Sequence, residues 1–142
     1  MKFILFLVFS YNKNRLRYFK TKKDIARLTL ALMFVLAGIL HFTITEKFIL
    51  IVPPFIPFPE VMVYLSGFFE ILGAIGLLVP QYSRQAAFGL ILLLVAVFPA
   101  NIYMAVENVQ LGGILNNPIL QWVRIPFQGV LIWWVLWCTE KR

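Results

Sequence analysis

Four polar side chains with acid–base or hydrogen-bonding chemistry stand inside apolar stretches of this 142-residue sequence: His41, Glu70, Asn101 and Arg124. An imidazole, a carboxylate, an amide and a guanidinium can pair their charges, relay a proton or hold the polar end of a small ligand. An unpaired charge at the centre of a membrane span costs about 3 kcal/mol. We therefore expect each of these groups to have a polar partner.

Glu70 lies at the midpoint of the apolar run 61–79, which contains no proline and is long enough to cross a bilayer as a helix. Helical spacing places Glu70 on a face with several small residues. Small residues allow another helix to approach closely. The pattern predicts that Glu70 faces a neighbouring helix and not lipid. The residues of this face are Ser66, Glu70, Gly73, Ala74 and Leu77.

The composition indicates an integral membrane protein. The chain is 61% hydrophobic and 13% charged, whereas a soluble domain carries about 25% charged residues. We predict an all-α fold, an antiparallel four-helix bundle with spans at about 24–45, 61–79, 86–106 and 119–138. A basic N-terminal extension (1–23) and a short tail (139–142) flank this domain, 24–138.

The distribution of positive charge predicts the topology. Six of the thirteen Lys and Arg residues lie between Lys13 and Lys23, and the formal net charge is +7. Charge gathered beside the first span is typical of orientation signals and anionic-lipid contact, and it argues against nucleic acid as a partner. With both termini cytoplasmic, eleven cations lie inside and only Lys47 outside, while Arg124 is within a span. The positive-inside rule favours this arrangement in a multi-pass membrane protein.

This topology brings the polar groups to a similar depth in the outer half of the membrane, at about 1.5 Å per helical residue. We expect them to converge in one pocket that opens outward beneath the proline-rich segment 46–60. Glu70 and Arg124 are expected to form an ion pair. The predicted buried polar network or ligand site consists of His41, Glu70, Asn101, Gln121, Arg124 and Gln128.

Three readings of this network stay open. It could serve only to fix how the helices pack, it could bind a small ligand such as a quinone headgroup, or it could relay protons or ions. A weak internal repeat adds to the pattern. Aligning AGILHF with VFPANI and FEIL with FQGV matches His41 to Asn101 and Glu70 to Gln128, a parallel repeat of two hairpins.

Familiar catalytic motifs are missing from the sequence. It has no phosphate-binding glycine loop, no HExxH and no Ser-His-Asp candidate. One histidine and one cysteine, Cys138, make a dedicated zinc or haem site improbable and exclude disulfide exchange within one chain. We therefore predict no catalytic residues and no metal site.

Five segments occur in a characteristic order: AGILHF, IVPPFIPFP, LSGFFEILGAIGLLVP, VFPANIYMA and RIPFQ. Together they resemble the DoxX-like family of small bacterial four-span membrane proteins, over about Ile25 to Trp137. The resemblance implies a four-helix protein of the bacterial plasma membrane. Members of that family are linked to a quinone-reducing thiosulfate oxidoreductase and to assemblies that handle oxidative or thiol stress. It supplies no agreed catalytic residues.

We accordingly expect an accessory, non-catalytic membrane subunit, whose outward-facing pocket accepts a quinone or a similar small molecule, with membrane or redox proteins as possible partners besides the lipid bilayer. One alternative is a small proton-coupled transporter or channel-like oligomer. Another is a purely structural assembly factor. The sequence identifies no substrate.

Overall fold

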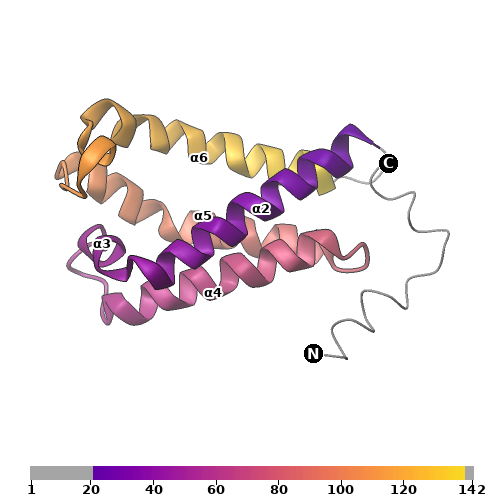
Figure 1. The fold of residues 1–142 in the computed structure, drawn as a ribbon, viewed down its shortest axis with the longest axis horizontal. Coiled ribbons are helices and arrows are strands. Elements are labelled where there is room, and N and C mark those ends of the chain that lie inside the picture. Colours follow the sequence, from indigo (N-terminus) through magenta and orange to yellow (C-terminus); the bar gives the residue numbers. More distant parts are fainter. Residues whose placement is uncertain (1–20, 140–142) are drawn as a thin grey trace.

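The computed structural model describes residues 21–139, and within them it contains only helices and their connections (Figure 1). Four helices are long and apolar enough to cross a membrane: α2 (Lys22–Thr43), α4 (Pro59–Leu78), α5 (Ser83–Val106) and α6 (Pro118–Thr139). Two short helices, α3 (Thr45–Leu50) and η2 (Gly113–Asn116), lie in the connections. The predicted all-α, four-span fold is confirmed, and the span boundaries agree within three residues.

Local sequence signals explain where the long helices begin. Thr21 and Asp24 form a capping box at the start of α2, in which each side chain bonds the backbone N–H of the other residue. Pro59 occupies the first turn of α4, where its missing N–H costs nothing. The predicted N-terminal extension lies almost entirely outside the described residues, as does the tail beyond Thr139.

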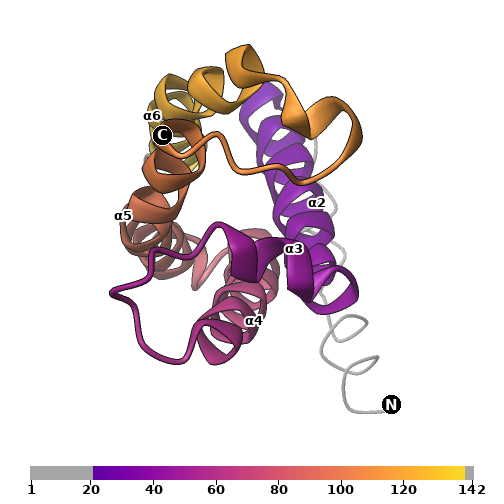
Figure 2. The ribbon, with the colours of Figure 1, turned by 90° about the vertical axis from the view of Figure 1, so that its left-hand side faces the viewer.

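The four long helices form a ring in which each packs against two neighbours (Figure 2). Around the ring the order is α2, α4, α5, α6, so that α4 and α6 occupy opposite corners. The first helix pair is joined through α3 and the second through η2. Helices that follow one another in the chain are therefore neighbours in the ring, and the last helix, α6, packs against the first, α2.

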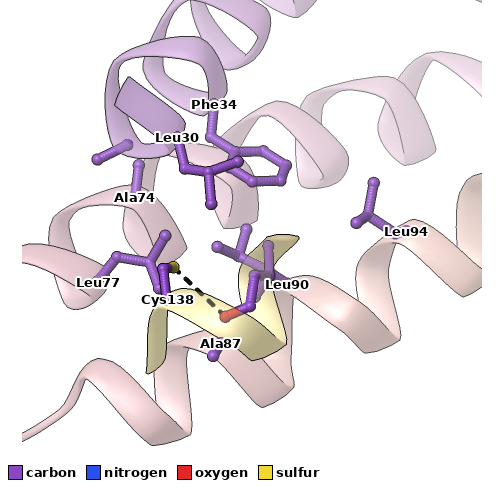
Figure 3. Packing of buried hydrophobic residues seen from close by; sticks show 10 residues of the cluster. Leu30, Phe34, Ala74, Leu77, Ala87, Leu90, Leu94 and Cys138 are labelled. Atoms are coloured by element: carbon purple, nitrogen blue, oxygen red, sulfur yellow. Dashed lines mark hydrogen bonds between the residues drawn. The ribbon is translucent and has the colours of Figure 1, made fainter. Parts of the chain in front are cut away.

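An apolar core fills one end of the ring, which we call the terminal end because α2 starts there and α6 ends there (Figure 1). Arg27 Nη2 of α2 donates a hydrogen bond to the Cys138 carbonyl of α6, at 2.7 Å. Figure 3 shows side chains from all four helices meeting around Leu30 and Leu90. The buried cluster comprises Leu30, Ala31, Phe34, Ala74, Leu77, Ala87, Leu90, Leu94, Val135 and Cys138.

At the opposite end, the α3 end, α3 and the segment 51–58 pack across the ring (Figure 2). Ile51 is buried with Met104 and Leu111 in a second apolar cluster. The prolines keep residues 51–58 out of helical structure, as expected from their missing N–H groups. Residues 51–58 of the proline-rich segment 46–60 therefore lie over this end of the bundle.

Helices α2 and α4 make close backbone contact through two glycines. A Cβ added to Gly38 would lie 2.7 Å from the Gly67 carbonyl oxygen, and one added to Gly67 would lie 2.8 Å from the Gly38 carbonyl oxygen. Contacts this short exclude any side chain at either position. This close approach sets the position of His41, whose Cβ would lie 2.7 Å from the same added atom on Gly67.

Candidate functional site

A cavity of about 510 Å³ lies between the four long helices toward the α3 end. Its volume is within the range of about 300–1,000 Å³ that small-molecule sites occupy. Five of the six predicted polar residues line it: His41, Glu70, Asn101, Arg124 and Gln128. The remaining wall is largely apolar, with Phe48, Ile51, Val52 and Ile56 covering the α3 end.

The first polar pair joins α2 and α4. Glu70 Oε2 lies 3.4 Å from His41 Nδ1, and both side chains are about nine-tenths buried. His41 Nδ1 is also 2.8 Å from the Ala37 carbonyl oxygen, one turn earlier in α2. The imidazole stacks on the ring of Phe48, with the centroids 4.0 Å apart. The imidazole is thus held from three sides, and the Glu70 carboxyl group is its ionisable neighbour.

Glu70 Oε2 is buried and accepts no hydrogen bond from the described residues. A buried acceptor without a donor loses about 1–3 kcal/mol of hydrogen bonding relative to water. Glu70 lines the cavity, so a donor inside the cavity could meet this need. The pair therefore offers a carboxylate and an imidazole to anything that enters.

The second polar pair joins α5 and α6. Asn101 Nδ2 donates to Gln128 Oε1 at 2.7 Å, and Gln128 Nε2 donates to the Leu94 carbonyl oxygen. Gln128 is buried, whereas Asn101 is half-buried. The second pair carries no ionisable group, and it offers amide donors and acceptors to the cavity.

The expected ion pair between Glu70 and Arg124 is wrong. In the described part of the chain the ionisable neighbour of Glu70 is His41, and Arg124 Nη1 instead lies 3.8 Å from the sulfur of Met104. The reason is the order of the helices, because α4 and α6 stand at opposite corners of the ring. Arg124 still lines the same cavity, half-buried near the α3 end.

Gln121 does not join the cavity wall. Its side chain is buried, and its Nε2 donates to the Val109 carbonyl oxygen at 2.9 Å. Val109 belongs to the connection between α5 and α6. Gln121 thus fastens this connection to the first turn of α6 and acts on the fold.

The two pairs occupy the positions that the weak internal repeat aligns. His41 matches Asn101 and Glu70 matches Gln128, and in each hairpin the two aligned residues contact one another. The cavity therefore lies between two halves, each with its own polar pair. Repeat interfaces near the middle of the bilayer are where many membrane proteins place their ligands.

Phe48 and Gly67 are parts of the site that sequence reasoning missed. In the sequence Phe48 follows the first span and has the position of a connection residue. In the structure its ring stacks on His41. Gly67 directly follows Ser66, a residue of the helix face predicted for Glu70. Widening that face by one position includes Gly67. Spacing from Gly38 to His41 and from Gly67 to Glu70 is three residues in both helices, a signal that could have indicated their contact.

Among known protein families, the family described as "Domain of unknown function (DUF8561)" matches residues 30–139. The chain belongs to this family. Neither the curated proteins nor the solved structures yield a match.

The DUF8561 match begins within α2 and runs to the last residue of α6. It therefore contains every residue that lines the cavity, both polar pairs and the contact of Gly38 with Gly67. The site belongs to the part of the chain that defines the family, and the basic N-terminal residues lie outside that part.

Proposed function

We propose that this integral membrane protein is an accessory subunit of a redox or stress-related membrane system, and that its cavity binds a quinone or a similar small molecule. The observation that carries the proposal is the convergence of two polar pairs on one cavity of about 510 Å³. An apolar pocket with a few convergent polar groups is the usual form of a small-molecule site.

The resemblance to the DoxX-like family supports the same proposal. That resemblance implies a link to quinone-dependent oxidoreduction, and AGILHF and LSGFFEIL, two of its motifs, contain the residues of the first polar pair. A ring carrying carbonyl oxygens could accept hydrogen bonds from the Asn101 and Gln128 amides. Its apolar face suits the Val63 and Leu94 wall.

Ligand-dependent stabilisation tests the proposal. The protein is placed in lipid nanodiscs and its melting temperature is measured with increasing decylubiquinone. A ligand at about 100 times its Kd adds about 2.7 kcal/mol to stability. We expect a saturable rise for the unchanged protein and for the control Gln85→Leu, since Gln85 is exposed near the start of α5. Asn101→Leu should weaken the response, and an absence of any response would refute quinone binding.

A second candidate function is proton-coupled transport, and the His41–Glu70 pair favours it. Ionisable pairs inside a span that face a cavity are typical of proton pathways. In proteoliposomes carrying a pH-sensitive dye, a carrier would give a flux that Glu70→Gln abolishes. If the flux equals that of empty liposomes, this candidate fails. A protein that neither binds quinone nor carries protons would fit a structural assembly factor.

A further inference from the structure

The boundaries between neighbouring helices differ in how tightly they are closed beside the cavity. Between α2 and α4, the contact of Gly38 with Gly67 leaves no room for a side chain. Between α5 and α6, Gln128 bonds the Leu94 carbonyl and Arg124 reaches Met104. Both hairpins are therefore closed along the cavity, which leaves the two boundaries between hairpins, α4 with α5 and α2 with α6. Helices α2 and α6 also contribute exposed lining residues, Leu40 (45%) and Phe127 (44%), but on α6 the lining Arg124 lies one turn before Phe127, so a tail leaving there would pass a guanidinium.

The boundary between α4 and α5 is closed only in its terminal half. There a Cβ added to Gly73 would lie 2.6 Å from the Leu90 side chain, and one added to Gly76 would lie 2.6 Å from the Ala86 Cβ. From their connecting turn toward the α3 end the two helices diverge (Figure 1). The cavity occupies the space between them where they part.

Residues on the lipid-facing edge of this boundary belong to the cavity wall. Leu65 and Phe69 of α4 line the cavity although 43% and 48% of their surfaces are exposed. On α5, Leu93 and Ala96 also line the cavity, and Ala96 is exposed. The cavity thus extends to the outer surface of the bundle between α4 and α5, through a rim that has no polar side chain. We call these four residues the α4–α5 rim.

The rim lies at hydrocarbon depth. Leu65 is six residues from the start of α4, or about 9 Å along the helix, and Ala96 is ten residues from the end of α5, or about 15 Å. The hydrocarbon core of a bilayer is about 30 Å thick. A molecule that passes the rim therefore comes from the lipid phase.

Access from water is less favourable. At the α3 end the cavity is covered by Phe48, Ile51, Val52 and Ile56, all of them apolar. A hydrophilic solute would have to displace this cover, whereas an apolar chain at the rim meets only side chains of its own kind.

From this geometry we infer that the ligand is an amphiphile dissolved in the bilayer. Its compact hydrogen-bonding headgroup lies in the cavity between the two polar pairs, and its linear apolar tail passes out between α4 and α5 through the rim. This inference rests on the proposed ligand-binding function. It adds the route of entry and the chemical class of the ligand.

Two probes that share a headgroup test the route: decylubiquinone, whose tail must stay in hydrocarbon, and ubiquinone-0, which has no tail and dissolves in water. Binding of each is measured by thermal shift in nanodiscs of one lipid composition. The blocking variants are Ala96→Trp on α5 and Leu65→Trp on α4, which narrow the rim from opposite sides. The control is Gly89→Trp, because Gly89 lies exposed on the same helix as Ala96 with open space around it.

We expect each blocking variant to weaken decylubiquinone binding by at least about tenfold, which corresponds to about 1.4 kcal/mol. Ubiquinone-0 should bind the blocking variants as it binds the unchanged protein, and Gly89→Trp should alter neither probe. If decylubiquinone binds both blocking variants normally, the route is overturned while the proposed function stands. If neither probe binds the unchanged protein, the proposed function falls and the inference falls with it. Using one variant from each helix separates a blocked rim from a misfolded protein.

Discussion

The two polar pairs differ in chemistry although they occupy equivalent places in the two hairpins. His41 and Glu70 can carry charge, whereas Asn101 and Gln128 are neutral amides. A ligand between them meets an ionisable side and a neutral side. This difference could fix the orientation of a bound ligand, which an entirely apolar cavity wall would not do.

Gln128 is the residue whose loss should disturb the second pair most. Replacing it by Leu keeps the volume but leaves Asn101 and the Leu94 carbonyl without their described partner. Interhelical hydrogen bonds in membranes are worth about 0.6 kcal/mol on average, with a maximum near 1.7. We expect Gln128→Leu to lower the free energy of unfolding by about 1–2 kcal/mol in reversible SDS titrations in mixed micelles.

The matched control for this change is Gln85→Leu, since Gln85 is exposed. Surface substitutions usually stay within about 0.5 kcal/mol. In a double-mutant cycle, Asn101→Leu should cost less in the Gln128→Leu background than alone, because the bond is already lost. Additive effects would show that the amide pair contributes no coupling.

Five of the six polar residues predicted from spacing line the cavity, but spacing did not predict which of them pair. Depth along each helix placed His41, Glu70 and Asn101 together correctly. The partner of Glu70 depends on which helix stands beside α4, and spacing within one helix carries no information on that. Opposite charge favoured Arg124 as the partner of Glu70, but α2 stands beside α4 and brings His41 to Glu70 instead.

At the scale of elements, the approach of α2 to α4 depends on Gly38 and Gly67. An added methyl at either position meets a backbone carbonyl, which cannot move aside as a flexible side chain can. Overpacking of this kind costs about 1–3 kcal/mol. We predict that Gly38→Ala and Gly67→Ala each destabilise the protein by that amount in SDS unfolding.

Gly129→Ala serves as the control because a Cβ at Gly129 meets nothing within 4 Å. Gly129 lies in α6, so its replacement also reports any general effect of Ala in a helix. Equal unfolding free energies for the three variants would show that the contact of α2 with α4 tolerates a side chain.

Arg27 ties the first helix to the last. It is buried and donates a hydrogen bond to the Cys138 carbonyl at 2.7 Å. Replacing it by Met keeps much of the apolar stem and removes the donor. We expect a loss of about 1–3 kcal/mol for Arg27→Met and almost none for Arg84→Met, where Arg84 is exposed. Equal losses of stability in Arg27→Met and Arg84→Met would indicate that the charge of Arg27 acts only at the membrane interface.

The element boundaries were predictable because prolines and polar clusters punctuate long apolar runs. Pro59 marks the start of α4, and the prolines at 53 and 54 end the helical stretch of α3. Helix α3 itself was not predicted, because six residues beside a proline cluster give no periodic signal.

At the scale of the whole molecule, the distribution of charge predicts that the terminal end faces the cytoplasm. Eleven cations lie on that side in the predicted topology and only Lys47 on the other. The single native cysteine is buried, so a Cys138→Ala background permits labelling at one chosen site. Gln110→Cys reports the α3 end and Gln81→Cys the terminal end, since both residues are exposed.

In intact cells, a membrane-impermeant maleimide should label Gln110→Cys. Gln81→Cys should react only after the membrane is permeabilised. The reverse pattern would invert the topology and would place the α3 end in the cytoplasm. Labelling of both in intact cells would contradict a four-span arrangement.

The fold as a whole followed from composition and from the lengths of the apolar runs, since a 142-residue chain with four such runs has few arrangements. The sequence predicted a cavity only because polar residues lie at a similar depth in the four predicted spans. Its volume and its extension between α4 and α5 depend on how far apart those helices stand, which Gly73 and Gly76 set at one end. The spacing of residues along one helix carries no information on the distance between two helices.

A crystal structure of the protein grown with decylubiquinone would locate the ligand and its tail. We expect density for the ring in the cavity, within hydrogen-bonding distance of at least one group among His41, Glu70, Asn101 and Gln128. We also expect the tail to leave between Leu65 and Ala96. A structure at saturating ligand in which side chains fill this cavity, or in which the ring binds elsewhere, would refute quinone binding in this cavity.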